Sequence, residues 1–192
     1  MAAALVELKM SEFDSYLWGS SKHFRCYQKL GAHLVEQEGL QGVHFACWAP
    51  NALSVSVMGD FNGWNRSSHP LQLQSASTGI WSAFVPGLQV GQAYKYCVHT
   101  GQGWSERCDP YGFWSELRPS NASRVWDLNR YTWGDAQWMQ QRKQSDPRTA
   151  PLSVYEVHLG SWMRRLDGSW MSYRELAEHL VNHVQHMGFT HV

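Results

Sequence analysis

Aromatic rings beside polar side chains are the most informative chemistry in this sequence. A pyranose packs its C–H face on an aromatic ring and presents a rim of hydroxyls, so a sugar site needs exposed rings and a few hydrogen-bonding groups. Trp64 lies in the Gly- and Asn-containing turn GDFNGWN. Lys95 lies on the polar side of the run AYKYCVH, and Trp104 follows a glycine-rich turn. These three residues are candidates for binding a sugar.

Each of these residues also has a purely structural alternative. Trp64 would then fill an interface between two domains, Lys95 would be a solvated charge, and Trp104 would pack under a loop. Other tryptophans are assigned to the core or to a domain interface by default: Trp48, Trp81, Trp126 and Trp133.

Acidic residues give no sign of a catalytic pair. Glu175 is expected to cap a helix, and Glu156 lies within an expected strand. The spacing of the remaining candidates does not pair an acid with a base: these are Asp60, Asp109 and Asp167. We therefore predict no catalytic residue in this chain.

Histidines and cysteines predict neither a metal site nor a cofactor. The ten histidines form no HExxH motif. The four cysteines, at positions 26, 47, 97 and 108, form no CxxC pair. Free thiols are typical of the reducing cytosol, so we expect a cytoplasmic location.

Composition excludes several classes of partner. The chain has 192 residues with 16 Lys and Arg and 16 Asp and Glu, so its formal net charge is zero. A neutral chain is a poor nucleic-acid binder, because such binding requires a basic surface. No apolar segment reaches the length that spans a bilayer, so we expect no membrane partner. The 11 tryptophans instead favour a neutral ligand with apolar faces, such as a sugar.

The elements that would position these residues alternate with period two. In QGVHFACWA, Val43, Phe45 and Cys47 are expected to face one way, and His44, Ala46 and Trp48 the other. LSVSVMGD is expected to form a strand with one solvated face. About six or seven short strands separated by turn residues predict an immunoglobulin-like antiparallel β-sandwich over residues 31–130. Residues 1–30 are expected to be irregular.

The pattern changes after the sandwich. Residues 131–150 are polar and predict a linker. LSVYEVHL then predicts a buried strand, and Ser172 with Glu175 predicts a capping box. A helix is expected to follow and to end at Gly188, before a second strand in FTHV. Residues 151–192 thus predict one β-α-β unit, which the sequence leaves incomplete.

Two sets of motifs resemble one enzyme family. YEVHLGSW and SYRELAEHLVNHVQHMGFTHV resemble the first strand, first helix and second strand of the catalytic barrel of bacterial 1,4-α-glucan (glycogen) branching enzymes. LGAH, FACWAPNALSVSVMGDFNGWN, GQAYKYCVHTGQG and CDPYGF resemble the glycogen-binding sandwich that precedes that barrel. The resemblance covers about residues 16–192. It implies a mainly β chain, a sandwich followed by the first β-α-β unit of an incomplete (β/α)8 barrel.

The resemblance also implies a function and a site. These enzymes move α-1,4-glucan segments to form α-1,6 branches by a retaining mechanism, with carboxylates on later barrel strands that have no counterpart here. Related sandwiches bind α-glucan such as glycogen or starch through residues that match Trp64, Lys95 and Trp104, and Asn121 is matched to a further polar contact. The chain alone is expected to be inactive, with the remainder of the barrel as its partner. Two alternatives are a stand-alone glycogen- or starch-binding module and a fragment of a debranching or trehalose-forming relative.

Overall fold

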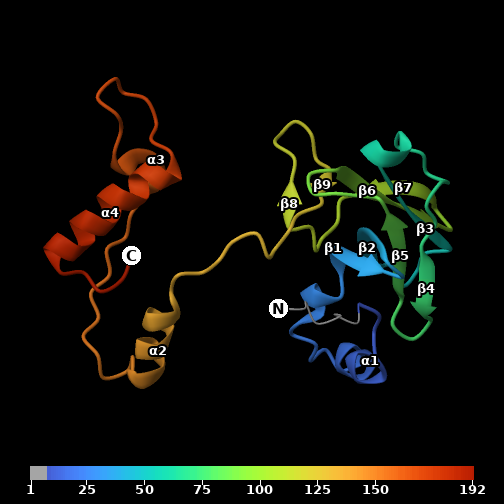
Figure 1. Cartoon of the computed structure of the whole chain (residues 1–192), viewed down its shortest axis with the longest axis horizontal. Coiled ribbons are helices and arrows are strands. Elements are labelled where there is room, and N and C mark those ends of the chain that lie inside the picture. The colour runs from blue at the N-terminus through green and yellow to red at the C-terminus, as the bar shows by residue number, and fades with distance from the viewer. Residues whose placement is uncertain (1–7) are drawn as a thin grey trace. The chain divides into compact units, whose positions relative to one another are not determined.

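The chain forms two compact units. The computed structural model describes residues 8–192, and residues 1–7 of the segment expected to be irregular lie outside this range. One unit extends to Tyr131 and is called the sandwich unit; the other covers Thr132–Val192 and is called the helical unit. Figure 1 shows strands in the sandwich unit and helices α2 to α4 in the helical unit.

The sandwich unit contains two antiparallel sheets. The first has the order β1-β2-β5-β4, and the second has the order β3-β6-β9-β8 with β7 also paired to β6. The first sheet consists of β1 (Gly31–Gln37), β2 (Leu40–Trp48), β5 (Ile80–Pro86) and β4 (Gln72–Ser75). The second consists of β3 (Ser54–Gly59), β6 (Ala93–Thr100), β7 (Gly103–Arg107), β8 (Trp114–Ser115) and β9 (Ser123–Arg124).

The core lies between these sheets. Phe45 and Val43 of β2 face Val57 of β3 and Tyr94 and Tyr96 of β6, and all five are almost fully buried. Phe45 meets Tyr94 edge to face with 5.0 Å between ring centroids. Two antiparallel sheets with these side chains buried between them confirm the predicted antiparallel sandwich.

The second face of β2 is also buried. His44 is 6% exposed and Ala46 is fully buried. Ala46 packs with Leu30 and Ile80 in a second small core, which Trp18 partly covers. The segment that precedes β1 therefore covers the side of the first sheet that faces away from the main core.

That segment also contains a helix where irregular structure was expected. Helix α1 (Glu12–Gly19) begins at a capping box in which the Ser11 hydroxyl accepts from the Asp14 amide and Asp14 binds the Ser11 amide. Lys29 and His23 each lie 3.0 Å from the Asp14 carboxylate. A 3₁₀ turn η1 (Cys26–Gln28) then leads into β1.

The outer face of β3 is not solvated as predicted. Ser56 is buried, and its hydroxyl donates to the Arg66 carbonyl. The segment that leads into β4 runs beside β3, where the Val57 amide donates to the His69 carbonyl and the Leu71 amide to the Val55 carbonyl. This segment covers the free edge of β3. An exposed strand edge is prone to pairing with other chains, and this contact protects the edge of β3 from that.

A buried carboxylate ties the second sheet to the loop before β8. Asp109 accepts hydrogen bonds from the hydroxyls of Tyr94 (2.7 Å) and Tyr96 (3.2 Å) and from the Tyr111 amide (2.8 Å). Its own amide donates to the Ser123 hydroxyl in β9. Burial raises the pKa of Asp109, and these donors oppose that shift. Asp109 therefore has a structural role.

The helical unit consists of α2 (Ala136–Gln144), α3 (Leu159–Trp162) and α4 (Tyr173–Met187). The predicted capping box of Ser172 and Glu175 is present, and Gly188 ends α4 with a φ of 75°. The two segments that flank α4 pair in parallel only at Val154 and His191, rather than as full strands. A parallel strand pair is unstable without neighbouring strands and covering helices. Helix α2 lies where a linker without secondary structure was expected.

Candidate functional site

The outer face of the second sheet brings two candidate residues onto one surface. Residues that alternate along a strand share a face, so Lys95 and His99 of β6 lie opposite to the core-facing Tyr94 and Tyr96. Trp104 of β7 is the direct cross-strand partner of His99 and therefore lies on the same face as Lys95. The pairing of β6 with β7 thus places two of the predicted residues on one surface, called here the outer face.

Trp104 is held in place by a ring contact. Its indole stacks on the His99 imidazole with 4.4 Å between centroids and 16° between planes. The Trp104 side chain remains 53% exposed. One face of the indole is therefore covered, and the exposed part is available for stacking on a sugar.

Trp64 extends from a tight turn at the end of β3. Its φ of 61° is left-handed, a conformation that costs about 1–3 kcal/mol for a residue other than glycine. The Asn62 side chain stabilises the turn, because its Oδ1 accepts from the Gly59 amide and its Nδ2 donates to the Val57 carbonyl. The 3₁₀ turn η2 (Asp60–Asn62) precedes Trp64, whose side chain is 38% exposed.

The strand register places Trp64 near Lys95. The Trp64 amide donates to the carbonyl of Gly59, and Gly59 pairs with Tyr94, the neighbour of Lys95. Lys95 itself pairs with Met58 of β3. Trp64 and Lys95 therefore lie toward one end of β6. Trp104 lies toward the other end, about 13 Å from Lys95 at the usual rise of a strand.

An ion pair connects the segment after Trp64 with strand β7. Arg66, two residues after Trp64, lies 2.7 Å from Glu106, two residues after Trp104. Glu106 pairs with Cys97 at the centre of β6. Exposed pairs of this kind contribute about 0–1 kcal/mol, so this ion pair adds little to the stability of the sandwich unit.

Asn121 is not brought to this surface by any contact among residues 8–192. It is exposed and lies in the loop before β9. The following residue, Ala122, is held by Glu116, whose carboxylate accepts from the Ala122 amide and whose own amide donates to the Ala122 carbonyl. Its participation in the site stays a prediction.

Several residues of this surface were missed by the sequence prediction. His99, Arg66 and Glu106 resemble ordinary surface residues in the sequence. The alternation along β6 could have identified His99, since it has the same parity as Lys95. Two tryptophans assigned to the core or an interface are also exposed in their own units, Trp48 at 54% and Trp133 at 74%.

No cluster of three or more His, Cys, Asp or Glu side chains that could hold a metal ion is found among residues 8–192. Asp60 accepts a hydrogen bond from the Ala93 amide. Glu175 binds Ser172 and Arg165, and these contacts lower its pKa to about 2. None of the helices within this range is long and apolar enough to cross a bilayer.

Comparison with known proteins identifies the sandwich. Residues 29–112 match the family model of carbohydrate-binding module 48, the isoamylase N-terminal domain. A solved structure of a Salmonella typhimurium protein assigned as an alpha amylase aligns with 84% of this chain and 23% of its own. Its TM-score is 0.56 at 21% identity, which shows a shared fold alone.

Curated relatives match almost the whole chain. The 1,4-alpha-glucan branching enzyme GlgB of Rhodopirellula baltica is 50% identical over 186 residues, which is 95% of this chain and 25% of the relative. GlgB of Rubrobacter xylanophilus is 48% identical over 185 residues, with the same shares. The chain thus spans about a quarter of the length of the curated relatives that it matches. The chain is similar to the N-terminal part of these 1,4-alpha-glucan branching enzymes, and its residues 29–112 match carbohydrate-binding module 48.

Proposed function

We propose that the outer face binds α-glucan through Trp64, Lys95 and Trp104, with Asn121 as a further contact. The observation that carries the proposal is the register of β6 and β7, which sets Trp104 on the face that carries Lys95. Two rings near opposite ends of one surface suit a chain of several glucose units. Lys95, at the same end of β6 as Trp64, offers donors to the sugar hydroxyls.

Stacking of His99 on Trp104 supports this proposal. A ring that is already oriented loses little conformational entropy when a ligand binds. The strained turn at Trp64, fixed by Asn62, provides the same advantage at the other end. The surface is therefore organised before any sugar arrives.

The test is migration of the purified chain through a native gel that contains glycogen. Trp64→Ala, Lys95→Ala and Trp104→Ala should each reduce retardation, with an affinity loss of roughly tenfold for each tryptophan because the stacking contact is lost. Trp138→Ala is the matched control, since Trp138 is 56% exposed and belongs to the helical unit. Unchanged retardation of Trp64→Ala and Trp104→Ala would overturn the assignment.

We propose further that this chain supplies glucan binding to an enzyme that transfers α-1,4-glucan segments to form α-1,6 branches. Residues 31–130 would be the binding sandwich and 131–150 the linker. Residues 151–192 would be the start of a barrel completed by segments beyond these 192 residues. Identities of 44–50% to branching enzymes support this proposal. The free, buried thiols of Cys47 and Cys97 support a cytoplasmic location.

The chain alone should form no branches. A retaining mechanism needs two carboxyl groups about 5–5.5 Å apart. The resemblance to branching enzymes implies that these groups lie on later barrel strands, and this chain matches only 25% of such a relative. The measurement is the appearance of new α-1,6 linkages in amylose incubated with the purified chain. Detectable branching would contradict the prediction that the catalytic residues lie elsewhere.

A further inference from the structure

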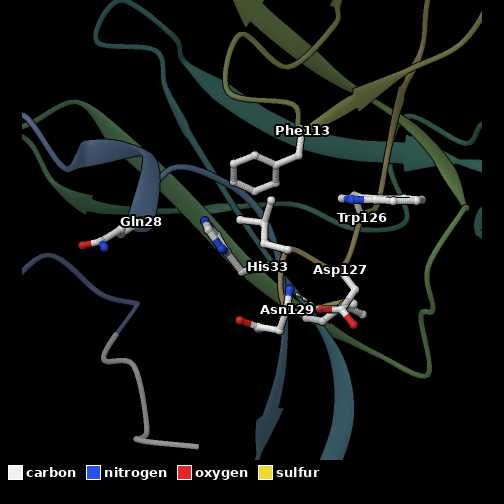
Figure 2. Close-up of a pocket in the computed structure, with 8 residues that line it drawn as sticks. Gln28, His33, Phe113, Trp126, Asp127 and Asn129 are labelled. Carbon is white, nitrogen blue, oxygen red and sulfur yellow. Dashed lines mark hydrogen bonds between the residues drawn. The ribbon is translucent and has the colours of Figure 1, made fainter. Parts of the chain in front are cut away.

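A cleft of about 310 Å³ lies in the sandwich unit, away from the outer face. It is formed by η1, β1 of the first sheet, the loop before β8 and the segment that follows β9. Figure 2 shows the side chains that surround it: Gln28, His33, Phe113, Trp126, Asp127 and Asn129. None of these residues belongs to the candidate site described above, which lies on the second sheet.

Aromatic rings form one part of this cleft and are fixed by their neighbours. Trp126 meets Trp114 edge to face with 5.0 Å between centroids, and the Arg130 guanidinium lies 5.4 Å from the Trp126 ring. Phe113 meets His33 edge to face at 5.3 Å. The cleft therefore presents rings whose orientation is set before a ligand binds.

Polar groups form the other part, and several have hydrogen-bonding capacity left. Oδ1 of Asp127 accepts from the Asn129 amide at 2.9 Å. Within residues 8–192, no partner is found for the second carboxylate oxygen of Asp127 or for the side-chain amides of Gln28 and Asn129. Amide groups both donate and accept, so with the carboxylate they match the alternating needs of neighbouring sugar hydroxyls.

The charge of the cleft narrows the ligand class. No lysine or arginine lines it. Burial lowers the pKa of His33, while its hydrogen bond to the Leu30 carbonyl opposes the shift, so the cleft disfavours the charged form of this ring. Asp127 is the one charged side chain among the lining residues, and the Arg130 guanidinium lies beside the cleft, 5.4 Å from the Trp126 ring. Rings, amides and a carboxylate are the groups that bind a polyhydroxylated ligand.

We propose that this cleft is a second carbohydrate site, which takes a short saccharide such as the end of an α-glucan chain. Its volume lies near the lower limit of about 300 Å³ for small-molecule pockets, which fits a short segment rather than a long chain. The choice of α-glucan rests on the proposed function of the outer face. Two separate sites would let one sandwich contact two chains or two parts of one chain, which raises avidity.

The test uses the full chain labelled with ¹⁵N, with maltotriose as the probe and the Trp126 indole N–H signal as the readout. The double variant Trp64→Ala/Trp104→Ala removes the outer-face rings and isolates the cleft. In this variant, maltotriose should still shift the Trp126 signal, and inorganic phosphate should not. Adding Asp127→Asn or Asn129→Ala should weaken maltotriose binding at least fivefold. Both changes are small, and an unchanged melting temperature checks the fold.

Three outcomes would overturn the proposal. The first is a double variant that shows no Trp126 shift with maltotriose while the wild-type chain binds it. The second is residual binding that neither Asp127→Asn nor Asn129→Ala weakens. The third is an equal shift with phosphate. A failure of the proposal that the outer face binds glucan is seen separately, as glycogen retardation that Trp64→Ala and Trp104→Ala leave unchanged.

Discussion

The sandwich unit and the helical unit are stabilised in different ways. Among residues 8–192, the buried apolar side chains lie in the sandwich unit, apart from Leu176 and Val184 of α4. The helical unit instead has local devices, such as the capping box of Ser172 and Glu175 and the ion pair of Arg165 with Glu175. A binding surface needs a rigid support, and only the sandwich unit has the core to provide it.

The largest expected effect on stability comes from removing the buried Asp109 carboxylate of the sandwich unit. Asp109→Ala leaves the hydroxyls of Tyr94 and Tyr96 and the Tyr111 amide without their acceptor in a dry interior. We expect the free energy of unfolding of the sandwich unit to fall by about 3 kcal/mol in urea denaturation followed by tryptophan fluorescence. Asp135→Ala, at an exposed position, is the control. A loss no larger than that of the control would contradict the structural role of Asp109.

The next effect is a dependence of the free energy of unfolding on pH. Burial first, and then the charges of His33 and Lys9, lower the pKa of His44 from 6.5 to about 4. Because the unfolded chain takes up this proton first as pH falls, stability present above pH 6.5 is lost between about 6.5 and 4. The loss amounts to about 3 kcal/mol for a shift of this size.

His44→Gln should reduce the pH dependence of the free energy of unfolding in that window. Part of the slope should remain, since the pKa of His33 is also lowered. The measurement is a series of urea titrations between pH 7.5 and 4.5. An identical slope in wild type and variant would show that His44 is not responsible.

A smaller effect concerns the turn that carries Trp64. Asn62→Ala removes the acceptor of the Gly59 amide and the donor to the Val57 carbonyl. We expect a loss of about 1–2 kcal/mol in stability of the sandwich unit, together with weaker glycogen retardation. Asn182→Ala, on α4 of the helical unit, is the control. Full glycogen affinity in Asn62→Ala would show that the turn is not needed to position Trp64.

The smallest effect should be confined to the helical unit. Ser172→Ala removes the hydroxyl that caps α4, which costs about 1 kcal/mol of helix stability. Hydrogen exchange of the α4 amides should become faster, while the amides of β2 and β6 stay unchanged. Faster exchange in β2 or β6 would mean that the two units do not differ as proposed.

The alternating strands were predictable because their pattern is strong. The runs that became β2, β3 and β6 alternate in side-chain character, and the run that became β5 is rich in β-branched and aromatic residues. Each of these strands contributes residues to the core. Strands β1 and β7 were missed, since β7 (Gly103–Arg107) is a short polar edge strand that packing does not mark in the sequence. Helix α1 was missed because its capping box uses Asp14 in place of the usual glutamate or glutamine.

The residues of the proposed site could be named from the sequence, but their arrangement could not. Lys95 and Trp104 share a surface because of the register of β6 and β7. That register is set by the turn after Thr100, and a slip of one residue would move Trp104 to the other face. The stacking of His99 on Trp104 depends on the same register, so the sequence alone could not predict it.

The most direct test of glucan binding by the outer face is calorimetric titration of the full chain with maltoheptaose. Wild type is compared with Trp64→Ala/Trp104→Ala and with the control Trp138→Ala. We expect the affinity for maltoheptaose to fall at least about 30-fold in the double variant, because two stacking contacts are lost. The control should bind maltoheptaose as tightly as wild type. Equal affinity in all three proteins would contradict glucan binding by this face.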